Sequence, residues 1–169
     1  MRRNSEQAVL STIIELCSRR LPNYYTECDK LKDIQVLTPM HKGSLGTVNI
    51  NRELQAILNP PSSEKTEKKS GSNVFRVGDK VMQIKNNYRL EWKNTEDFSD
   101  GTGIFNGDIG FIVSIDNENN KLDVIFDDIK RASYDFTMID ELELAYAMTI
   151  HKSQGSEFPV IVMPVAAFP

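Results

Sequence analysis

The stretch that decides the fold of this chain runs Ala147-Met148-Thr149-Ile150-His151-Lys152-Ser153-Gln154-Gly155-Ser156-Glu157-Phe158-Pro159, and the apolar residues 160–163 follow it. Hydroxyl, imidazole, ammonium, amide and carboxylate groups lie close together here around a single glycine. Each such group would cost roughly 1–3 kcal/mol if it were buried without a partner, so a core segment has no use for them. The apolar residues on either side indicate a strand, a polar turn or short helix, and a second strand. The stretch therefore predicts an α/β domain with a polar site at the edge of a buried parallel sheet.

The first third of the chain has the same strand-and-helix character. Residues 34–37 read as a short buried strand that Pro39 ends, and Gly43 and Gly46 open the loop after it. Apolar residues at helical spacing then predict a helix that stops at residues 59–61. A longer helix is expected at residues 5–20, with Asn4 and Gln7 at the spacing of a capping box.

The middle of the chain has a different pattern. Residues 62–72 are polar and charged, and they predict a mobile linker or long loop. Short β segments follow at 80–85, 110–116, 121–126 and 130–136, with turn signals at 106–107 and 116–120. Four or five antiparallel strands of this length suit a small SH3-like barrel. Residues 89–103, which contain Trp92, are too long for a hairpin turn and are expected to form a functional or mobile loop.

After the barrel, alternating apolar residues predict one strand that starts in the barrel and ends in the α/β sheet; they are Leu142, Leu144, Tyr146 and Met148. The barrel would thus be inserted between two parts of the α/β domain. Such an insertion is tolerated where the host chain ends lie close together at the surface.

Three blocks of this sequence resemble superfamily 1 helicases. The run from Thr149 to Phe158 is similar to the fifth motif of that superfamily, and its spelling KSQGSEF is most similar to the RecD-like branch, which includes the alpha subunit of exodeoxyribonuclease V. Residues 34–43, with Gly46 and 51–60, resemble the fourth motif and its helix. Residues 75–83, with Asn86-Asn87 and 105–110, resemble the SH3-like insert of the family.

The resemblance implies a domain arrangement. Residues 1–72 and 141–169 would form part of the second RecA-like motor domain, a parallel α/β domain, and residues 73–140 would form the inserted SH3-like antiparallel β-barrel. The family activity is ATP-dependent unwinding of DNA with 5′ to 3′ polarity, and its partners are single-stranded DNA, the remaining helicase domains of the parent chain and other exodeoxyribonuclease V subunits. DNA repair and recombination in the cytoplasm are the settings that this implies.

The family's ATP-binding elements are missing from the sequence. No G-x-x-x-x-G-K-[ST] phosphate-binding loop occurs, and Lys152-Ser153 only imitates its last two letters without a glycine-rich turn before it. The acidic magnesium-binding motif is absent too, as is the sixth motif with its arginine, which is expected soon after Pro169. We therefore expect a piece of a larger motor that binds ATP and Mg²⁺ only in the full-length parent. The isolated piece is expected to hold no cofactor, to have no catalytic residue and to be inactive alone.

The resemblance also assigns roles to single residues. Some residues of the fifth motif would face single-stranded DNA. They offer neutral donors, a cation and an imidazole, which suit contacts that do not depend on base sequence: Thr149, His151, Lys152, Ser153 and Gln154. Nucleotide binding or coupling would fall to Gly155, Glu157, Thr38, Lys42 and Gly43. The alternative for the fifth motif is a structural turn with Gly155 as its cap and Glu157 in a salt bridge. For Lys42 the alternative is a solvated lysine in a tight turn, and His41 reads as a surface residue.

Composition excludes some classes of function. The chain has 169 residues and a net charge of −4, which argues mildly against a general nucleic-acid binder but leaves local positive charge open. Cys17 and Cys28 read as free thiols of a reducing cytosol, no metal-ligand set occurs, and no apolar run reaches membrane-spanning length.

A basic and aromatic cluster lies in the middle of the chain: Lys80, Lys85, Arg89 and Lys93 with Tyr88 and Trp92. Acidic residues interleave with it, so a solvated loop is the simpler interpretation. The alternative for the whole chain is a stand-alone SH3-like module that binds a protein partner.

Overall fold

The computed structural model describes residues 5–165, which divide into two compact units. One unit contains the residues up to Pro60 and those from Tyr146 onward, and the other is Pro61–Ala145. The second unit contains more residues than the insert expected at 73–140. A hairpin that begins at Glu67 and a strand after residue 140 both pair within this unit.

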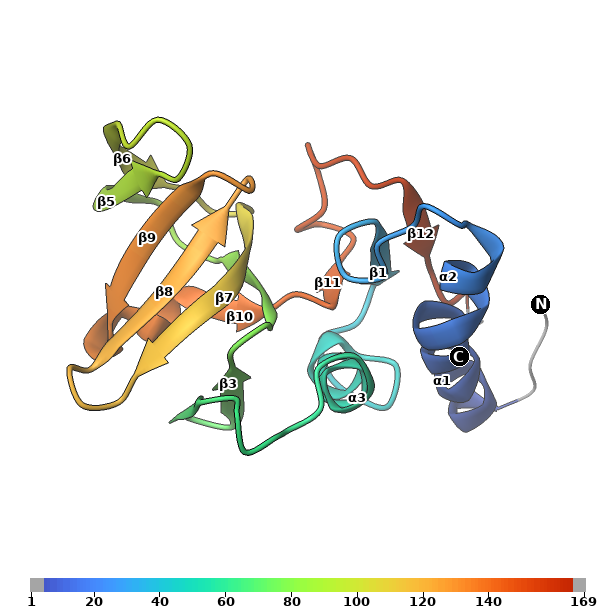
Figure 1. Cartoon of the computed structure of the whole chain (residues 1–169). Coiled ribbons are helices and arrows are strands. Elements are labelled where there is room, and N and C mark those ends of the chain that lie inside the picture. Colours follow the sequence, from blue (N-terminus) through green and yellow to red (C-terminus); the bar gives the residue numbers. More distant parts are fainter. Residues whose placement is uncertain (1–4, 166–169) are drawn as a thin grey trace. The chain divides into compact units, whose positions relative to one another are not determined.

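The first unit is a small parallel α/β structure. Its helices are α1 (Glu6–Glu15), the π-helical turn η1 (Leu16–Arg20), α2 (Leu21–Tyr24) and α3 (Thr47–Leu58), and its strands are β1 (Ile34–Thr38), β11 (Ala147–Thr149) and β12 (Val160–Val162). The three strands form a sheet in the order β11-β1-β12, with β1 parallel to both neighbours (Figure 1). The parallel sheet that the polar stretch predicted is therefore present, and the polar stretch connects its two outer strands.

Local sequence explains where the helices begin and end. The Ser5 side chain accepts a hydrogen bond from the Ala8 N–H at 3.2 Å and so caps α1, whereas Asn4, expected in that role, lies outside the described residues. α1 and η1 together cover the helix expected at 5–20, and Leu10, Ile13 and Cys17 are buried on one face. α3 ends at Leu58, directly before the expected stop at 59–61.

Helix α3 closes the outer edge of β11. The Asn51 side-chain amide donates to the Ala147 carbonyl at 2.9 Å, and its oxygen accepts from the Ala147 N–H at 2.8 Å. One side chain thus makes the two hydrogen bonds that a further strand would make, so these buried backbone groups stay paired at the sheet edge.

The second unit is antiparallel. Its strands are β2 (Glu67–Ser70), β3 (Asn73–Arg76), β4 (Lys80–Gln83), β5 (Asn87–Asn94), β6 (Asp100–Ile104), β7 (Ile109–Asp116), β8 (Lys121–Phe126), β9 (Lys130–Asp135) and β10 (Leu142–Leu144), with a 3₁₀ helix, η2 (Phe136–Glu141). Seven of them form one sheet in the order β10-β4-β7-β8-β9-β5-β6, and β2 and β3 form a separate hairpin. The long strands β7, β8 and β9 lie side by side in Figure 1. Their inward residues, such as Ile112, Leu122, Val124 and Phe126, are almost fully buried.

The expected linker at 62–72 is wrong in its second half. β2 and β3 pair from Glu67↔Arg76 to Ser70↔Asn73, and Gly71 takes a φ of +59° in the turn between them. The Arg76 Nε donates to the Glu67 carboxylate at 2.7 Å, which ties the two ends of the hairpin together. Because β2 is charged and largely exposed, its sequence carries no hydrophobic alternation that would reveal a strand.

The expected loop at 89–103 is also wrong, because most of it is the β5–β6 hairpin. Its turn lies near Phe98, which has a φ of +58°, and the Asn94 side chain accepts from the N–H groups of Glu96 and Asp97. The barrel therefore has more strands than the four or five expected. The single strand expected across 142–148 is split into β10, which pairs with β4, and β11, which pairs with β1.

A buried polar network braces the β4–β5 junction of the second unit. The Tyr134 hydroxyl donates to the Gln83 side-chain oxygen at 2.7 Å, and the Gln83 amide donates to the Glu141 carboxylate at 2.8 Å. The Asn87 amide also donates to Glu141, at 3.0 Å. Burial, and then the nearby Glu141 charge, raise the pKa of Tyr134 far above its usual range, so this hydroxyl remains a donor.

Candidate nucleic-acid interface

The fourth-motif and fifth-motif segments meet at the carboxyl edge of the parallel sheet. Thr38 ends β1, Thr149 ends β11, and the two are register partners. Just beyond them, the Ile150 N–H donates to the Thr38 carbonyl at 3.3 Å. Because parallel strands end on the same side, the loops after β1 and β11 leave the sheet together, which is where open α/β sheets bind ligands.

The segment after β11 is a series of tight turns. The Ser153 N–H donates to the Thr149 carbonyl at 3.2 Å, and the Lys152 N–H donates to the Thr149 hydroxyl at 3.2 Å. The Ser153 hydroxyl donates to the Ile150 carbonyl at 2.7 Å. Gly155 ends the turns with a φ of +84°, a conformation that favours glycine. Local hydrogen bonds thus fix the backbone of this segment.

The side chains of this segment reach the surface. His151, Gln154 and Glu157 are exposed, and Thr149, Lys152 and Ser153 are half-buried. Within residues 5–165 the Glu157 carboxylate makes no ion pair, so the salt bridge offered as its structural alternative is not observed. His151, Gln154 and Glu157 therefore reach solvent at this edge, whereas the hydroxyls of Thr149 and Ser153 are held by local hydrogen bonds.

The loop after β1 is held from below by Thr38. Its fully buried hydroxyl donates to the Leu45 carbonyl at 2.7 Å and accepts from the Met40 N–H at 3.3 Å. Gly46 packs against this loop so closely that a Cβ would lie 2.5 Å from the Lys42 carbonyl oxygen. Lys42 and Gly43 remain exposed, so in the described structure Thr38 braces the loop and its neighbours face solvent. A nucleotide contact for Thr38, Lys42 or Gly43 stays a prediction.

A hollow of about 330 Å³ lies between this loop and the start of α3. It is lined by His41, Lys42, Gly43, Val48, Asn49 and Arg52. The His41 Nδ1 lies 2.9 Å from the Thr47 hydroxyl, in keeping with a turn residue. Arg52 was missed from the sequence, although its spacing from Asn49, to which it donates, puts both on one face of the helix. Lys42 and Arg52 thus bring two basic side chains to one hollow, although the Arg52 guanidinium also lies 3.9 Å from the Glu53 carboxylate.

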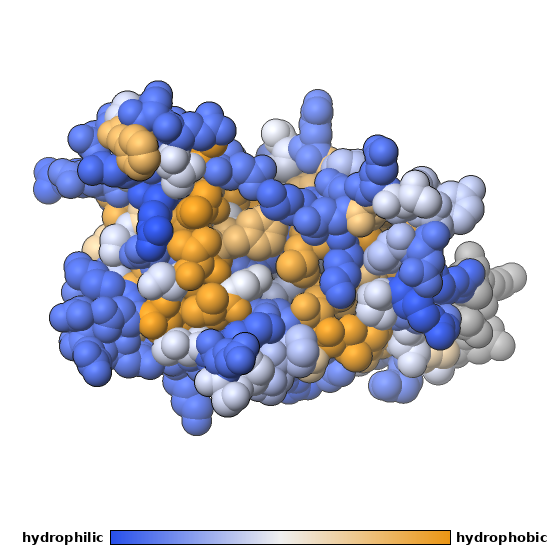
Figure 2. All heavy atoms as spheres, viewed as in Figure 1, coloured by the Kyte–Doolittle hydropathy of each residue, from blue (hydrophilic) through white to orange (hydrophobic). Residues whose placement is uncertain are grey.

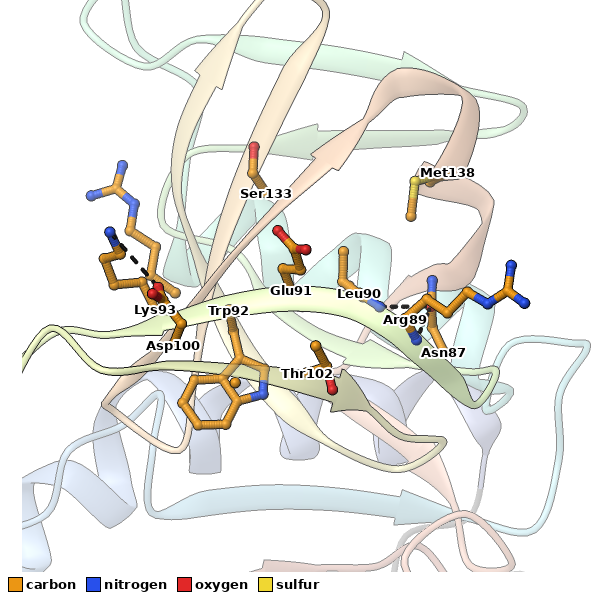
Figure 3. A pocket seen from close by; sticks show the side chains of 12 residues that line it. Asn87, Arg89, Leu90, Glu91, Trp92, Lys93, Asp100, Thr102, Ser133 and Met138 are labelled. Atoms are coloured by element: carbon orange, nitrogen blue, oxygen red, sulfur yellow. Dashed lines mark hydrogen bonds and ion pairs between the residues drawn. The ribbon is translucent and has the colours of Figure 1, made fainter.

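The second unit carries a groove of about 930 Å³ between β5, β6 and β9. Figure 3 shows Lys93 and Asp100 at one end of it and Asn87 and Arg89 at the other. Lys93 lies 3.8 Å from Asp100, so the positive charge at that end is compensated. In Figure 2 the surface over the β5–β6 hairpin is largely hydrophilic, with one small hydrophobic spot.

The basic and aromatic cluster expected in this unit is not a single patch. Lys80 is only 2% exposed, because β4 lies inside the sheet between β10 and β7. The Trp92 ring packs over Gly101, where a Cβ would lie 2.2 Å from the indole, and its Nε1 has no hydrogen-bond partner among the described residues. Tyr88, Arg89, Trp92 and Lys93 lie along strand β5, and Lys85 lies in the exposed bend between β4 and β5.

Cofactor ligands are not evident in the described part of the chain. Within residues 5–165 no group of three or more His, Cys, Asp or Glu side chains is placed to hold a metal ion, and neither Cys17 nor Cys28 forms a disulfide. Partial burial, and then the negative charges of Asp33 and Asp29, raise the pKa of the Cys28 thiol. None of the helices in this range is both long and apolar enough to cross a bilayer.

Two family models match the sequence. Residues 50–126 match the SH3 domain of ATP-dependent RecD-like DNA helicases, and residues 144–169 match the UvrD-like helicase C-terminal domain. The first match covers most of the antiparallel unit, and the second contains β11, the polar turns and β12. The two models thus match the barrel and the fifth-motif segment of the chain.

Two similar proteins each align with about three quarters of the chain. The ATP-dependent RecD2 DNA helicase of Deinococcus radiodurans is 35% identical over 129 residues, which is 76% of this chain and 16% of the relative. An uncharacterized protein of Methanocaldococcus jannaschii is 35% identical over 148 residues, 77% of this chain and 12% of the relative. The chain therefore spans less than a fifth of the length of either relative.

Solved structures of Pif1 helicases from Bacteroides are similar as well. Unliganded Pif1 is 20% identical with a TM-score of 0.43, covering 79% of this chain and 47% of Pif1. Pif1 in complex with ADP-AlF3 and single-stranded DNA is 18% identical with a TM-score of 0.46, covering 96% of this chain and 40% of Pif1. With both family models and the RecD2 relative pointing the same way, the chain belongs to the RecD-like DNA helicase family, carrying its SH3 domain and a part of its C-terminal helicase domain.

Proposed function

We propose that this chain is the part of an ATP-dependent DNA helicase that holds single-stranded DNA against the carboxyl edge of its parallel sheet. The observation that carries the proposal is the register pairing of Thr38 with Thr149, which brings the two motif loops to one edge, where Lys42, His151 and Gln154 are exposed. A motor that moves along any sequence needs contacts to sugar and phosphate, and hydroxyl, amide and ammonium groups supply them.

On this proposal the two sides of the edge have different tasks. His151, Lys152, Ser153 and Gln154, with Thr149 at the strand end, contact the DNA strand. Lys42, beside the hollow that it shares with Arg52, meets a phosphate of DNA or nucleotide. Glu157 is acidic and would repel a phosphate, so it contacts the nucleotide ribose or a bridging group. Thr38, Gly43 and Gly155 act through the backbone that they shape.

ATP and Mg²⁺ belong to the full-length protein in this proposal. The sequence contains no phosphate-binding loop, so hydrolysis requires residues that this chain does not supply. ATP binding would close two motor domains across the strand, and release would open them, with 5′ to 3′ movement as in the family resemblance. Work within an exodeoxyribonuclease V complex, in repair or recombination in the cytoplasm, is the corresponding extension. A stand-alone SH3 module has no support, because the SH3 model that matches is that of a helicase.

The experiment is an unwinding assay with Thr149→Ala and His151→Ala in the full-length protein that contains this chain. Both variants are expected to unwind a 5′-tailed duplex at least about 5-fold more slowly, since each loses a strand contact of roughly 1 kcal/mol or more. Val113→Ala, on the exposed side of β7, is the control and is expected to unwind normally. Wild-type unwinding by both site variants would remove these residues from the DNA contact.

A further inference from the structure

Two aromatic side chains stand exposed at one end of the β5–β6 hairpin. Tyr88 is 68% and Phe105 41% exposed, and their rings meet edge to face with centroids 5.5 Å apart and planes at 66°. An edge-to-face pair leaves a ring face open to solvent. The pair is therefore a ready surface for a flat partner.

The backbone under the pair is fixed by side-chain hydrogen bonds. The Asn87 side-chain oxygen accepts from the Arg89 N–H at 3.2 Å and the Leu90 N–H at 2.9 Å, which sets the chain after Tyr88. On the other side, the Phe105 N–H donates to Asp108 at 2.8 Å. The Asn106 N–H donates to the Asn86 side chain at 2.9 Å, so the two segments that carry the rings are tied to each other.

Deeper contacts hold these segments in turn. Asn87 donates to Glu141, which also receives the Gln83 amide of the buried Tyr134 network. The Phe105 ring lies over Gly103, where a Cβ would come within 2.7 Å of its Cζ. The rings are thus held before any ligand arrives, and a preorganised site loses little conformational freedom on binding.

A cation follows Tyr88 directly in the chain. Arg89 is exposed and its guanidinium has no ion-pair partner within residues 5–165, whereas Lys85 lies 3.3 Å from Asp140. Arg89 and Asn87 both line the end of the groove in Figure 3, where Arg89 extends away from the strand. An open aromatic face and, at the next position of the chain, an uncompensated guanidinium match the two parts of a nucleotide, its base and its phosphate.

Resting on the proposed function, we infer that the Tyr88–Phe105 pair stacks on an unpaired base of single-stranded DNA while Arg89 contacts the adjacent phosphate. A base fits better than an apolar peptide, because polar residues flank the rings in the sequence, namely Asn86, Arg89 and Asn106. Stacking does not depend on base identity, as a translocating motor requires.

The test uses the full-length protein and single-stranded oligonucleotides that carry 2-aminopurine, whose fluorescence falls on stacking. Tyr88→Ala and Phe105→Ala are expected to weaken binding roughly 5- to 150-fold and to lose quenching, whereas Tyr88→Phe keeps both. Phe98→Ala is the matched control, since Phe98 is an equally exposed aromatic (71%) at the other end of the same hairpin. Abasic oligonucleotides should bind the wild type and Tyr88→Ala equally.

Several outcomes would overturn the inference. If Tyr88→Ala binds and quenches as Phe98→Ala does, the pair does not stack on DNA. If Tyr88→Ala weakens abasic and normal oligonucleotides alike, the pair contacts protein or supports the fold. Thr149→Ala, measured in parallel, separates the two proposals: loss of unwinding there with unchanged quenching in Tyr88→Ala refutes the stacking inference alone.

Discussion

Neighbouring residues of one motif do different physical work in this chain. Thr38 is fully buried and its hydroxyl donates to the Leu45 carbonyl, whereas Lys42, four positions later, is exposed and lines a hollow. The same contrast separates Thr149, whose hydroxyl receives the Lys152 N–H, from the exposed His151. Each motif therefore contains residues that fix the backbone through hydrogen bonds and residues whose side chains reach solvent. Only the geometry distinguishes the two kinds.

Gly46 tests the brace in the fourth motif. In Gly46→Ala the new Cβ would lie within 2.6 Å of the carbonyl oxygens of both His41 and Lys42, which are backbone atoms that cannot rotate away. We expect a loss of about 1–3 kcal/mol in the free energy of unfolding, measured by urea denaturation. The control is Val48→Ala, at an exposed position of α3, which should change the free energy of unfolding by less than about 0.5 kcal/mol. Equal stability of Gly46→Ala and the wild type would show that the loop is not close-packed.

At the scale of elements, the strands with one buried face could be predicted and the polar hairpins could not. The expected segments at 110–116 and 121–126 correspond closely to β7 and β8, because their residues alternate between core and solvent. β2 shows no such alternation, and in β5 the apolar positions are limited to Leu90 and Trp92, with a register shift between Asn87 and Glu91. These hairpins depend on ladders and on turn residues such as Gly71, which hydrophobic patterns do not report.

Helix α3 and strand β11 depend on each other through Asn51. Asn51→Leu keeps the side-chain volume but leaves the N–H and carbonyl of the buried Ala147 without these partners. The expected loss is roughly 2–4 kcal/mol in the free energy of unfolding, measured by thermal or urea denaturation of the chain. Ile57→Ala, at an exposed position of the same helix, is the control and should be nearly neutral. A neutral Asn51→Leu would mean that water reaches the edge of β11.

At the scale of the whole molecule, the family and the parallel sheet could be predicted because the fifth-motif segment is dense in unusual polar residues between two apolar strands. The geometry of the site could not. Nothing in the sequence shows that Arg52 joins Lys42 at one hollow, or that Tyr88 meets Phe105 across sixteen intervening positions, which are roughly the length of a hairpin. Such contacts arise from packing and strand register, which single-sequence patterns leave open.

The central claim is that the carboxyl edge of the β11-β1-β12 sheet lies against single-stranded DNA. Amide hydrogen exchange of the full-length protein, with and without an oligonucleotide, tests it most directly. The account predicts slower exchange on DNA binding in residues 149–156, with no change in residues 24–33 near the opposite, amino-terminal edge of β1. Protection of 24–33, or unchanged exchange throughout 149–156 at saturating DNA, would contradict it.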